Sequence, residues 1–365
     1  MKEGWEYKKL GEVCDIYQPK TISGKDLVED GKYLVYGANG VIGKYNSYNH
    51  EKSEVLMTCR GATCGTINVS EPYSWINGNA MVVHPRHNIL SQNFLFYLLK
   101  GLDLSDVITG AAQPQITRQS LAPKKIAIPP LSEQQHIVEE LDLLSSIIEK
   151  KKAQLKELDN LAQSIFYEMF GDPTKTSKGW EVKKIGDVCI LKSGNSDANK
   201  SASGDLPYVK VGDMNLEGNE TYIVLSSTYV DRVANARNIF PIGTIIFPKR
   251  GGAILTNKKR LTKTDICCDL NVMGVIPNTD IVIPLYVYYY FLRIDFSVFA
   301  NTGSTIPQIN NYDIAPMNIV LPPMDVQKQF ASNIDSIEGQ KELIKQSIKE
   351  VETMYNSRMD LLFNM

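Results

Sequence analysis

The sequence predicts an α+β protein: two similar β-rich domains at opposite ends of a long antiparallel two-helix coiled coil, related by a pseudo-two-fold axis. Two observations predict this fold. The 365-residue chain repeats itself at a long offset, and each copy ends in a heptad pattern. A repeat offset of 175 residues is far longer than a solenoid unit. It indicates a duplicated domain with its following helix, in a chain whose length suits two or three domains.

Two strings carry the duplication. The opening string GWEYKKLGEVCDI at 4–16 recurs as GWEVKKIGDVCIL at 179–191, and eight of 13 positions are identical. The string APKKIAIPPLSEQQ at 122–135 recurs as APMNIVLPPMDVQK at 315–328, with six of 14 positions identical. The offset grows from 175 to 193 along the chain. Insertions are therefore expected in the front of the second copy.

A weaker match lies between these strings. TCRGATCG at 58–65 parallels PKRGGAIL at 248–255. NAMVV, which starts at Asn79, parallels NVMGV, which starts at Asn271. Since Asn79 and Asn271 share a repeat position, we expect them to have a structural role common to both copies.

The front of each copy is expected to be mostly β. Short apolar runs are broken by Gly, Asn and Pro: YLVYG, EVLMTC and MVVHP in the first copy, GTIIFP and VMGVIP in the second. One helix is expected near QNFLFYLLKGL and another near PLYVYYYFLRIDF. The tyrosine cluster at 286–290 should form the inner face of the second of these helices, packed on its sheet.

The rear of each copy begins at a double proline. The prolines at 129–130 and 322–323 follow the short strands KIAI and NIVL. They end these strands, because proline cannot donate a hydrogen bond to a strand ladder. We expect a long helix after each pair, with Ser132 and Asp325 as the N-caps.

Apolar residues in both helices step by threes and fours over nearly five heptads, which is typical of a coiled-coil seam. The seam of the first copy contains Ile137, Leu141, Leu144, Ile148, Lys151, Leu155, Leu158, Ala162, Ile165 and Met169. The seam of the second contains Phe330, Ile334, Ile337, Lys341, Ile344, Ile348, Val351, Tyr355, Arg358 and Leu362. The sequence leaves open whether the two seam lysines tune the helix register.

The length of the helices predicts the topology. About 35 helical residues at 1.5 Å each span roughly 50 Å, so the first helix carries the chain that far from the first domain. The second helix needs a partner for its apolar seam, and the first helix offers the matching one. Pairing the two requires the second helix to run back antiparallel.

Composition limits the class of protein. With 43% apolar residues, a mean hydropathy of −0.19 and no long apolar run, the chain shows neither a membrane span nor a signal peptide, so a cytoplasmic location is expected. Its six cysteines and four histidines have no disulfide or metal spacing. We find no methyltransferase Pro-Pro-aromatic motif, cofactor or nucleotide loop, or nuclease carboxylate cluster. The sequence therefore gives no sign of catalysis in this chain.

Charge is distributed unevenly along the chain. Residues 1–130 and 173–303 carry net charges of +2 and +4, whereas 131–172 and 304–365 carry −5 and −3. Two similar but non-identical heads held at a fixed separation suit DNA with two half-sites. Their weak positive charge implies few phosphate contacts, or help from a partner protein.

In their order and duplication these motifs resemble the specificity (S) subunits of type I restriction–modification systems. The resemblance rests on the GW…K-x-LG-x-V opening, the Arg-Gly strand end, PQI at 114–116 and 307–309, I-x-x-PP…EQ and the long helix. It covers essentially the whole chain. It implies target recognition domains at 1–130 and 173–323, with spacer helices at 131–172 and 324–365.

In that family each recognition domain reads one half of a split, asymmetric sequence of double-stranded DNA. The helices set the gap between the half-sites and dock two modification (methyltransferase) subunits, to which restriction (translocase–nuclease) subunits are added. The resemblance thus implies a non-catalytic chain without a cofactor of its own. S-adenosylmethionine, ATP and Mg are expected in the partner subunits.

Basic and aromatic residues of the two heads are the candidates for DNA contact, because Arg reads guanine or clamps phosphate and Lys binds phosphate. They are Lys44, Tyr45, Arg60, Lys210, Lys249, Arg250, Lys258, Lys259 and Arg260. For each of them a solvated loop or turn is the competing interpretation.

The helix starts are the candidates for partner docking, at Gln134, Gln135 and Gln327. The second copy departs from the SEQQ pattern as DVQK, so its docking surface is expected to differ slightly. Two other functions stay open from sequence. One is a nuclease with an unrecognised site, and the other is a coiled-coil scaffold that binds two proteins.

Overall fold

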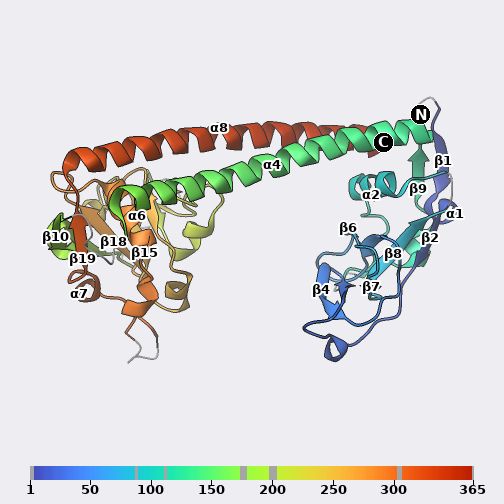
Figure 1. Cartoon of the computed structure of the whole chain (residues 1–365), viewed down its shortest axis with the longest axis horizontal. Helices are drawn as coiled ribbons and strands as arrows, with labels where there is room; N and C mark the ends of the chain where they lie inside the picture. Colours follow the sequence, from blue (N-terminus) through green and yellow to red (C-terminus); the bar gives the residue numbers. More distant parts are fainter. Residues whose placement is uncertain are drawn as a thin grey trace. The chain divides into compact units, whose positions relative to one another are not determined.

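The computed structural model describes residues 4–86, 89–110, 113–172, 179–196, 204–301 and 306–363. The chain forms two compact units. Unit 1 contains Met1–Ala153 with Ile344–Met365, and unit 2 contains Gln154–Leu343. The two long helices, α4 (Leu131–Phe170) and α8 (Met324–Phe363), each contribute one segment to each unit (Figure 1).

Apart from a two-stranded pair described below, unit 1 contains two sheets that are mainly antiparallel. The larger has the strand order β2 (Cys14–Tyr17), β8 (Ala80–Pro85), β5 (Val55–Thr58) and β6 (Ile67–Val69). The smaller has the order β4 (Gly40–Tyr45), β3 (Tyr33–Gly37) and β7 (Trp75–Ile76), with β3 and β7 parallel. The short runs expected to be strands therefore pair as strands.

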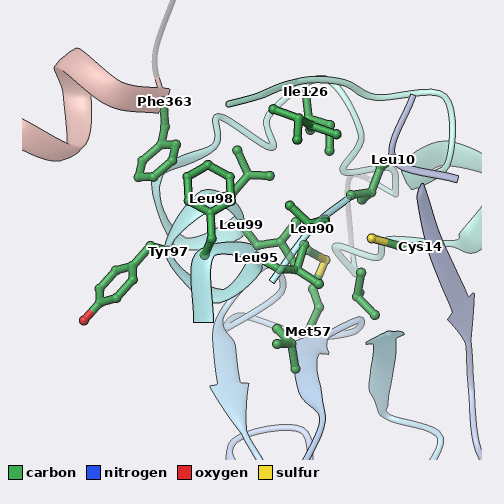
Figure 2. Close-up of a cluster of buried hydrophobic side chains, with 14 of the residues drawn as sticks. Leu10, Cys14, Met57, Leu90, Leu95, Tyr97, Leu98, Leu99, Ile126 and Phe363 are labelled. Carbon is green, nitrogen blue, oxygen red and sulfur yellow. The ribbon is translucent and has the colours of Figure 1, made fainter. Parts of the chain in front are cut away.

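The core of unit 1 lies between the larger sheet and helix α2 (Gln92–Gly101). The Ser91 hydroxyl caps this helix by accepting a hydrogen bond from the Phe94 amide at 3.2 Å. Leu95 and Leu98 of α2 belong to the same buried cluster as Met57 of the sheet (Figure 2). The C-terminal turn of α8 completes this core, because Phe363 packs edge-on against Phe94.

The duplicated strings form one joint in each unit. Strand β1 (Glu6–Lys9) pairs antiparallel with β9 (Lys125–Ile128), and β10 (Glu181–Lys184) pairs in the same way with β19 (Asn318–Leu321). The second strand of each pair precedes the double proline. A short helical turn follows the first strand in each case: α1 (Leu10–Val13) and α5 (Ile185–Val188). The repeated sequence is thus the place where head and long helix are connected.

Unit 2 repeats the topology of unit 1. Its larger sheet has the order β11 (Cys189–Ser193), β18 (Val272–Pro277), β15 (Ile245–Pro248), β16 (Arg260–Thr262) and β13 (Tyr222–Ile223). Its smaller sheet has the order β14 (Tyr229–Val230), β12 (Leu206–Val209) and β17 (Cys267–Cys268), with β12 and β17 parallel. Strand β13 has no counterpart in unit 1, and it lies in the front of the second copy, where insertions were expected.

Helix α6 (Pro284–Leu292) buries its tyrosines against the joint of unit 2. The Tyr286 hydroxyl donates to the Val320 carbonyl at 2.7 Å, and the Tyr290 hydroxyl donates to the Asn318 carbonyl at 2.8 Å. Both acceptors belong to β19. The prediction that this cluster is an inner helix face is confirmed.

In each unit, α4 and α8 run antiparallel. In unit 1, Glu140 pairs with Arg358 at 2.9 Å and Lys152 pairs with Glu352 at 2.8 Å, so higher numbers on α4 meet lower numbers on α8. In unit 2, Lys341 of α8 pairs with Asp159 of α4 at 2.8 Å. All the seam residues expected from the heptads are buried or half-buried.

The N-termini of the two long helices contradict the predicted N-caps. Helix α4 begins at Leu131, where the Pro130 carbonyl accepts the first helical hydrogen bond, from the Gln134 amide at 2.9 Å. Helix α8 begins in the same way after Pro323. Ser132 and Asp325 therefore lie in the first turn, and the prediction that they are N-caps was wrong. The second proline of each pair thus stands at the cap position, where its missing N–H is not needed for the helical hydrogen bonds.

Candidate nucleic-acid interface

The Arg-Gly turn and the PQI segment meet in both units. The Gly61 amide donates to the Pro114 carbonyl at 2.9 Å, and the Gly251 amide donates to the Pro307 carbonyl at 2.8 Å. Antiparallel bridges join the preceding arginine to the glutamine of the PQI segment in each case. Two short motifs far apart in the sequence therefore form one loop cluster, and this cluster is present twice.

Backbone conformation explains the glycine of this turn. Gly61 has φ 91° and Gly251 has φ 73°, in the left-handed region that side chains disfavour. A Cβ atom would meet nothing within 4 Å at either position. The backbone conformation, and not lack of space, thus requires glycine. The arginines before them, Arg60 and Arg250, have exposed side chains.

A third segment supports the turn in each unit. In unit 1 the tip of the β3–β4 hairpin is held by Thr63, whose hydroxyl donates to the Asn39 side chain at 2.5 Å, and by Thr58, whose hydroxyl donates to the Ala38 carbonyl. In unit 2 the 3-10 turn η2 (Val211–Asn215) takes this place, because the Lys258 ammonium donates to the Asn215 side chain. The turn thus has a shared core and a different neighbour in each unit.

Two of the predicted DNA residues of unit 1 lie on this hairpin. Lys44 is exposed on β4, and Tyr45 is half-buried at its end. The Tyr45 ring packs edge-on against Trp75, with 5.4 Å between the ring centroids. Lys44 is therefore available to a ligand, whereas the Tyr45 ring is partly used in packing.

Lys259 does not face solvent, and its predicted phosphate contact was wrong. Its side chain is 1% exposed, and its ammonium donates to the Ile294 carbonyl at 2.6 Å and to the Asn257 side chain at 2.5 Å. It lies 4.3 Å from the centroid of the Phe296 ring. Burial lowers its pKa to about 8. The basic loop folds back over an aromatic ring, which its sequence did not reveal.

Arg260 is half-buried and is hydrogen-bonded to backbone carbonyls of unit 2. Its guanidinium donates to the Lys259 carbonyl at 2.8 Å and to the Met214 carbonyl at 3.1 Å, and burial lowers its pKa. These hydrogen bonds tie strand β16 to η2. The structure gives this arginine a structural role, and its contact with phosphate stays a prediction.

Three other predicted lysines of unit 2 are half-buried and hydrogen-bonded to uncharged side chains. Lys210 donates to the Thr228 hydroxyl at 3.1 Å, and Lys249 donates to the Ser193 hydroxyl at 2.8 Å. Lys258 donates to Asn215, as described above. Burial lowers the pKa of Lys249. No carboxylate of the described residues forms an ion pair with any of the three. Their contacts with phosphate stay a prediction.

The predicted docking role of Gln134 and Gln327 was wrong, because both side chains are buried in the joints. The Gln134 amide group donates to the carbonyls of Ile89 and Pro129 at 2.7 and 2.9 Å, and its oxygen accepts from the Ser91 amide at 2.8 Å. Gln327 makes the equivalent contacts in unit 2, with the Pro322 carbonyl at 2.9 Å among them.

This burial explains why the glutamine occurs in both SEQQ and DVQK while its neighbours differ. A side chain that completes the hydrogen bonds of buried backbone groups cannot vary freely. Gln135, in contrast, is exposed and donates to Glu139 at 2.9 Å on the helix surface. Of the three predicted docking residues, Gln135 alone faces outward.

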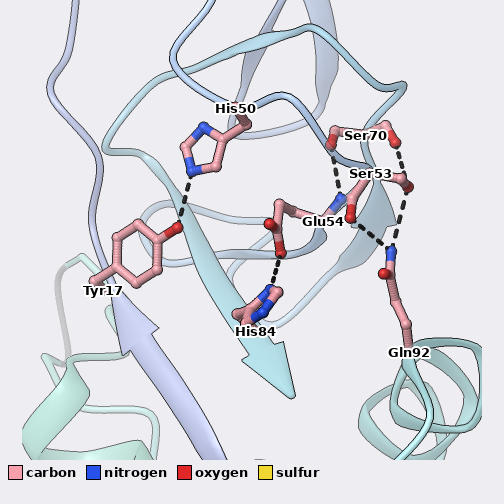
Figure 3. Close-up of polar contacts among 7 residues, drawn as sticks. All are labelled: Tyr17, His50, Ser53, Glu54, Ser70, His84 and Gln92. Carbon is pink, nitrogen blue, oxygen red and sulfur yellow. Dashed lines mark hydrogen bonds and ion pairs between the residues drawn. The ribbon is translucent and has the colours of Figure 1, made fainter. Parts of the chain in front are cut away.

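A polar cluster in unit 1 was not foreseen from the sequence (Figure 3). The buried Glu54 carboxylate contacts His84 Nδ1 at 2.7 Å, and the Tyr17 hydroxyl lies 2.9 Å from His50 Nε2. Burial lowers the pKa of His50. The strand registers place Lys192 and Phe240 of unit 2 at the positions of Tyr17 and His50, and that lysine lies 5.0 Å from the phenylalanine ring centroid. This location therefore differs in chemistry between the units.

Neither a metal site nor a membrane helix occurs in the part of the chain that the structure describes. None of its groups of His, Cys, Asp and Glu has three or more members placed to hold a metal ion. None of its helices is long and apolar enough to cross a membrane.

A twice-repeated α+β unit with a solvent-facing arginine turn in each copy defines a duplicated recognition chain. The family model described as "Type I restriction modification DNA specificity domain" matches residues 2–159 and again residues 177–353. The chain therefore belongs to the type I restriction–modification specificity family and carries two copies of its domain. Members of this family are the non-catalytic recognition components of these systems, so the expectation of a non-catalytic chain is confirmed.

Curated relatives agree over nearly the full length. The type I restriction enzyme MjaIX specificity subunit of Methanocaldococcus jannaschii is 25% identical over 380 residues, which covers 91% of this chain and 86% of the relative. A putative type I restriction enzyme specificity subunit of Haemophilus influenzae is 23% identical. The match covers 98% of this chain and 95% of the relative.

Solved structures agree in fold. The type I S subunit from M. genitalium superposes with a TM-score of 0.62 at 13% identity, covering 99% of this chain and 96% of that one. A chain from a study of complex assembly and conformational transition in a type I system superposes with a TM-score of 0.61 at 17% identity, covering 100% and 98%. The expected α+β fold with its internal duplication is confirmed.

Proposed function

We propose that this chain reads a split, asymmetric sequence in double-stranded DNA, one half-site with each β-rich part. The observation that carries this proposal is the duplicated Arg-Gly turn. Arg60 and Arg250 are exposed in the same hydrogen-bonded setting, while the segments beside them differ. A chain that reads two different half-sites of one polymer needs this combination of shared and differing parts.

The two arginines are assigned to the DNA backbone. Phosphates are the same in every half-site and position the protein, whereas base edges carry the sequence information. A feature that both units share suits the feature that both half-sites share. The differing neighbours, such as the β3–β4 hairpin of unit 1 and η2 of unit 2, are assigned to the bases.

The helices are assigned to partner docking and to fixing the gap between half-sites. In unit 1 they expose Leu143, Met354 and Leu361, and in unit 2 they expose Leu161 and Leu343. Contiguous exposed apolar patches mark protein-binding surfaces, and we assign these side chains to such patches. The proposed partners are two modification subunits and, added to them, restriction subunits. S-adenosylmethionine, ATP and Mg are assigned to these partners.

A genome-wide map of methylated adenines tests the proposal. The map is made in the host with the gene intact, deleted, and restored as a variant with both Arg60 and Arg250 replaced by alanine. We expect a split motif, two defined parts around a fixed gap, that disappears on deletion and is weakened in the variant. A motif that persists after deletion would show that this chain does not direct the modification.

A further inference from the structure

Exposed apolar side chains lie on the segments that support or continue the Arg-Gly turn of each unit, and they differ between the units. In unit 1 they are Val41 and Ile42, which are 53% and 47% exposed on β4. The hairpin that carries them is fixed to the turn through Asn39 and Ala38. In unit 2 the apolar side chain is Leu255, which is 76% exposed in the loop that follows Arg250.

Loop length explains why the apolar groups differ. Between strands β5 and β6 the loop of unit 1 covers residues 59–66, and between β15 and β16 the loop of unit 2 covers residues 249–259. Both loops begin alike. The Cys64 amide donates to the Gly61 carbonyl, and the Ile254 amide donates to the Gly251 carbonyl. Unit 1 then returns directly to its strand, whereas unit 2 continues into Leu255. The longer loop therefore adds an apolar side chain that unit 1 lacks at this place.

Leu255 stands on a firmly anchored loop. Ile254 before it is buried. Asn257 after it accepts from the Phe296 amide at 2.9 Å and donates to the Ile294 carbonyl at 3.3 Å, and the buried Lys259 reinforces this contact. The backbone on both sides of Leu255 is thus fixed while its side chain remains in solvent. A pre-organised apolar group of this kind loses little entropy when a ligand covers it.

DNA offers one apolar group to such a side chain, the C5-methyl of thymine in the major groove. The exposed arginine of each turn complements the phosphate that accompanies every base. We infer that Val41 and Ile42 in unit 1 and Leu255 in unit 2 contact thymine methyl groups, and so contribute different base preferences to the two half-sites. This inference rests on the proposed function. It assigns base reading to apolar residues, whereas the candidates from the sequence were basic and aromatic.

A double-mutant cycle, in which a protein variant is combined with a base change in the DNA, tests the inference. The chain assembled with its modification subunits is titrated with duplexes that carry the recognised site, in which each thymine is replaced in turn by uracil. Uracil lacks only the methyl group. We expect one replacement in one half-site to weaken binding about fourfold, the equivalent of one buried methyl group. Leu255→Ala should cause a similar loss on thymine DNA and should remove the response to uracil at that position.

The same cycle with Val41→Ala and Ile42→Ala should give its response in the other half-site. Ile190→Ala is the matched control, because Ile190 is 68% exposed in unit 2 but lies on β11, outside the loop cluster. It should leave all affinities unchanged.

Three results would overturn the inference while the proposed function stands. They are additive effects of Leu255→Ala and uracil, a recognised site without thymine on either strand, and a variant that weakens binding of the modification subunit instead of DNA. Failure of the proposed function looks different. In that case the unaltered complex would bind the split site no better than unrelated DNA.

Discussion

At the scale of single residues, burial decides the role of the polar side chains. Gln134 and Lys259 are chemically suited to a surface site, but each satisfies backbone carbonyls inside its unit. Arg60 and Arg250 remain exposed because they precede a glycine whose backbone turns away from the strand. The polar residues that hold the fold are thereby separated from those that can meet a ligand.

The buried glutamine gives a prediction on stability. Gln134→Ala leaves the Ser91 amide and the carbonyls of Ile89 and Pro129 without their partner, so we expect the free energy of unfolding to fall by about 1–3 kcal/mol. Urea unfolding followed by circular dichroism measures it. The control is Gln135→Ala on the exposed side of the same turn, which should change stability by less than about 0.5 kcal/mol. Equal effects of the two variants would contradict the structural role.

Lys259 gives a prediction on pH. Burial lowers its pKa from 10.5 to about 8 in the folded protein. Between these values the unfolded chain binds the proton that the folded chain has released, so stability rises with pH across this window. In the Lys259→Met variant this contribution should be absent. The measurement is the free energy of unfolding at several pH values from about 7.5 to about 10, because the effect ends near the unfolded pKa of 10.5. Parallel pH profiles for the two proteins would refute the assignment.

The exposed arginines give a prediction on DNA affinity. Arg60→Ala and Arg250→Ala should each weaken binding of the assembled complex to all sequences alike and lower the salt dependence by about one phosphate contact. The measurement is affinity at several salt concentrations on cognate and unrelated duplexes. Relaxed discrimination between bases at one position, with an unchanged salt slope, would instead place the arginine on a base edge.

At the scale of elements, the joint and the long helices hold each unit together. The strand pairs β1–β9 and β10–β19 have the same register, and each leads through two prolines into a 40-residue helix. In unit 2 the helix seam contains the buried Lys341, which contacts both Asp159 and Glu338. Burial alone would lower the pKa of Lys341, but the hydrogen bonds to these two carboxylates raise it overall.

This buried ion pair gives a prediction on the helix seam. Lys341→Leu leaves the largely buried Glu338 carboxylate without its cation, so the free energy of unfolding should fall by up to about 3–5 kcal/mol. Lys349→Leu, on the exposed surface of α8, is the control and should have little effect. Urea unfolding compares the two variants. Unchanged or increased stability in Lys341→Leu would contradict the role of this lysine in neutralising the buried carboxylate.

At the scale of the whole molecule, duplication followed by divergence is the organising feature. Both units keep the larger sheet, the smaller sheet and the joint, while unit 2 adds strand β13 and a longer loop after Arg250. Shared parts maintain the fold and the connection to the helices. Divergent parts surround the exposed turn. The molecule can therefore change what each half recognises without changing how it is built.

Exchange of the two front parts tests this modularity. A chain in which residues 1–130 and 173–323 change places should direct methylation to the same two half-sites in reversed order around the same gap. The joints should accept the exchange because their strand registers are equal in both units. The methylation map of a host that carries the exchanged chain gives the result. An unchanged motif would refute the modular organisation.

The sequence by itself determined the duplication, the two proline-bounded strands and the long helices. These features follow from local patterns: identical strings at a fixed offset, prolines that end a strand ladder, and apolar residues spaced by threes and fours. Arg60 and Arg250 were also found from the sequence, because a repeated Arg-Gly pair at a strand end is visible in the alignment of the two copies.

Only the tertiary structure decided which of the polar residues are buried. Lys259 contacts Ile294, and Gln134 contacts Ser91, through segments that are distant in the sequence. The Glu54–His84 pair depends on strand pairing in the same way. Local sequence carries no information on such partners. Burial depends on which distant segment covers a side chain, and that is settled when the sheets and helices pack.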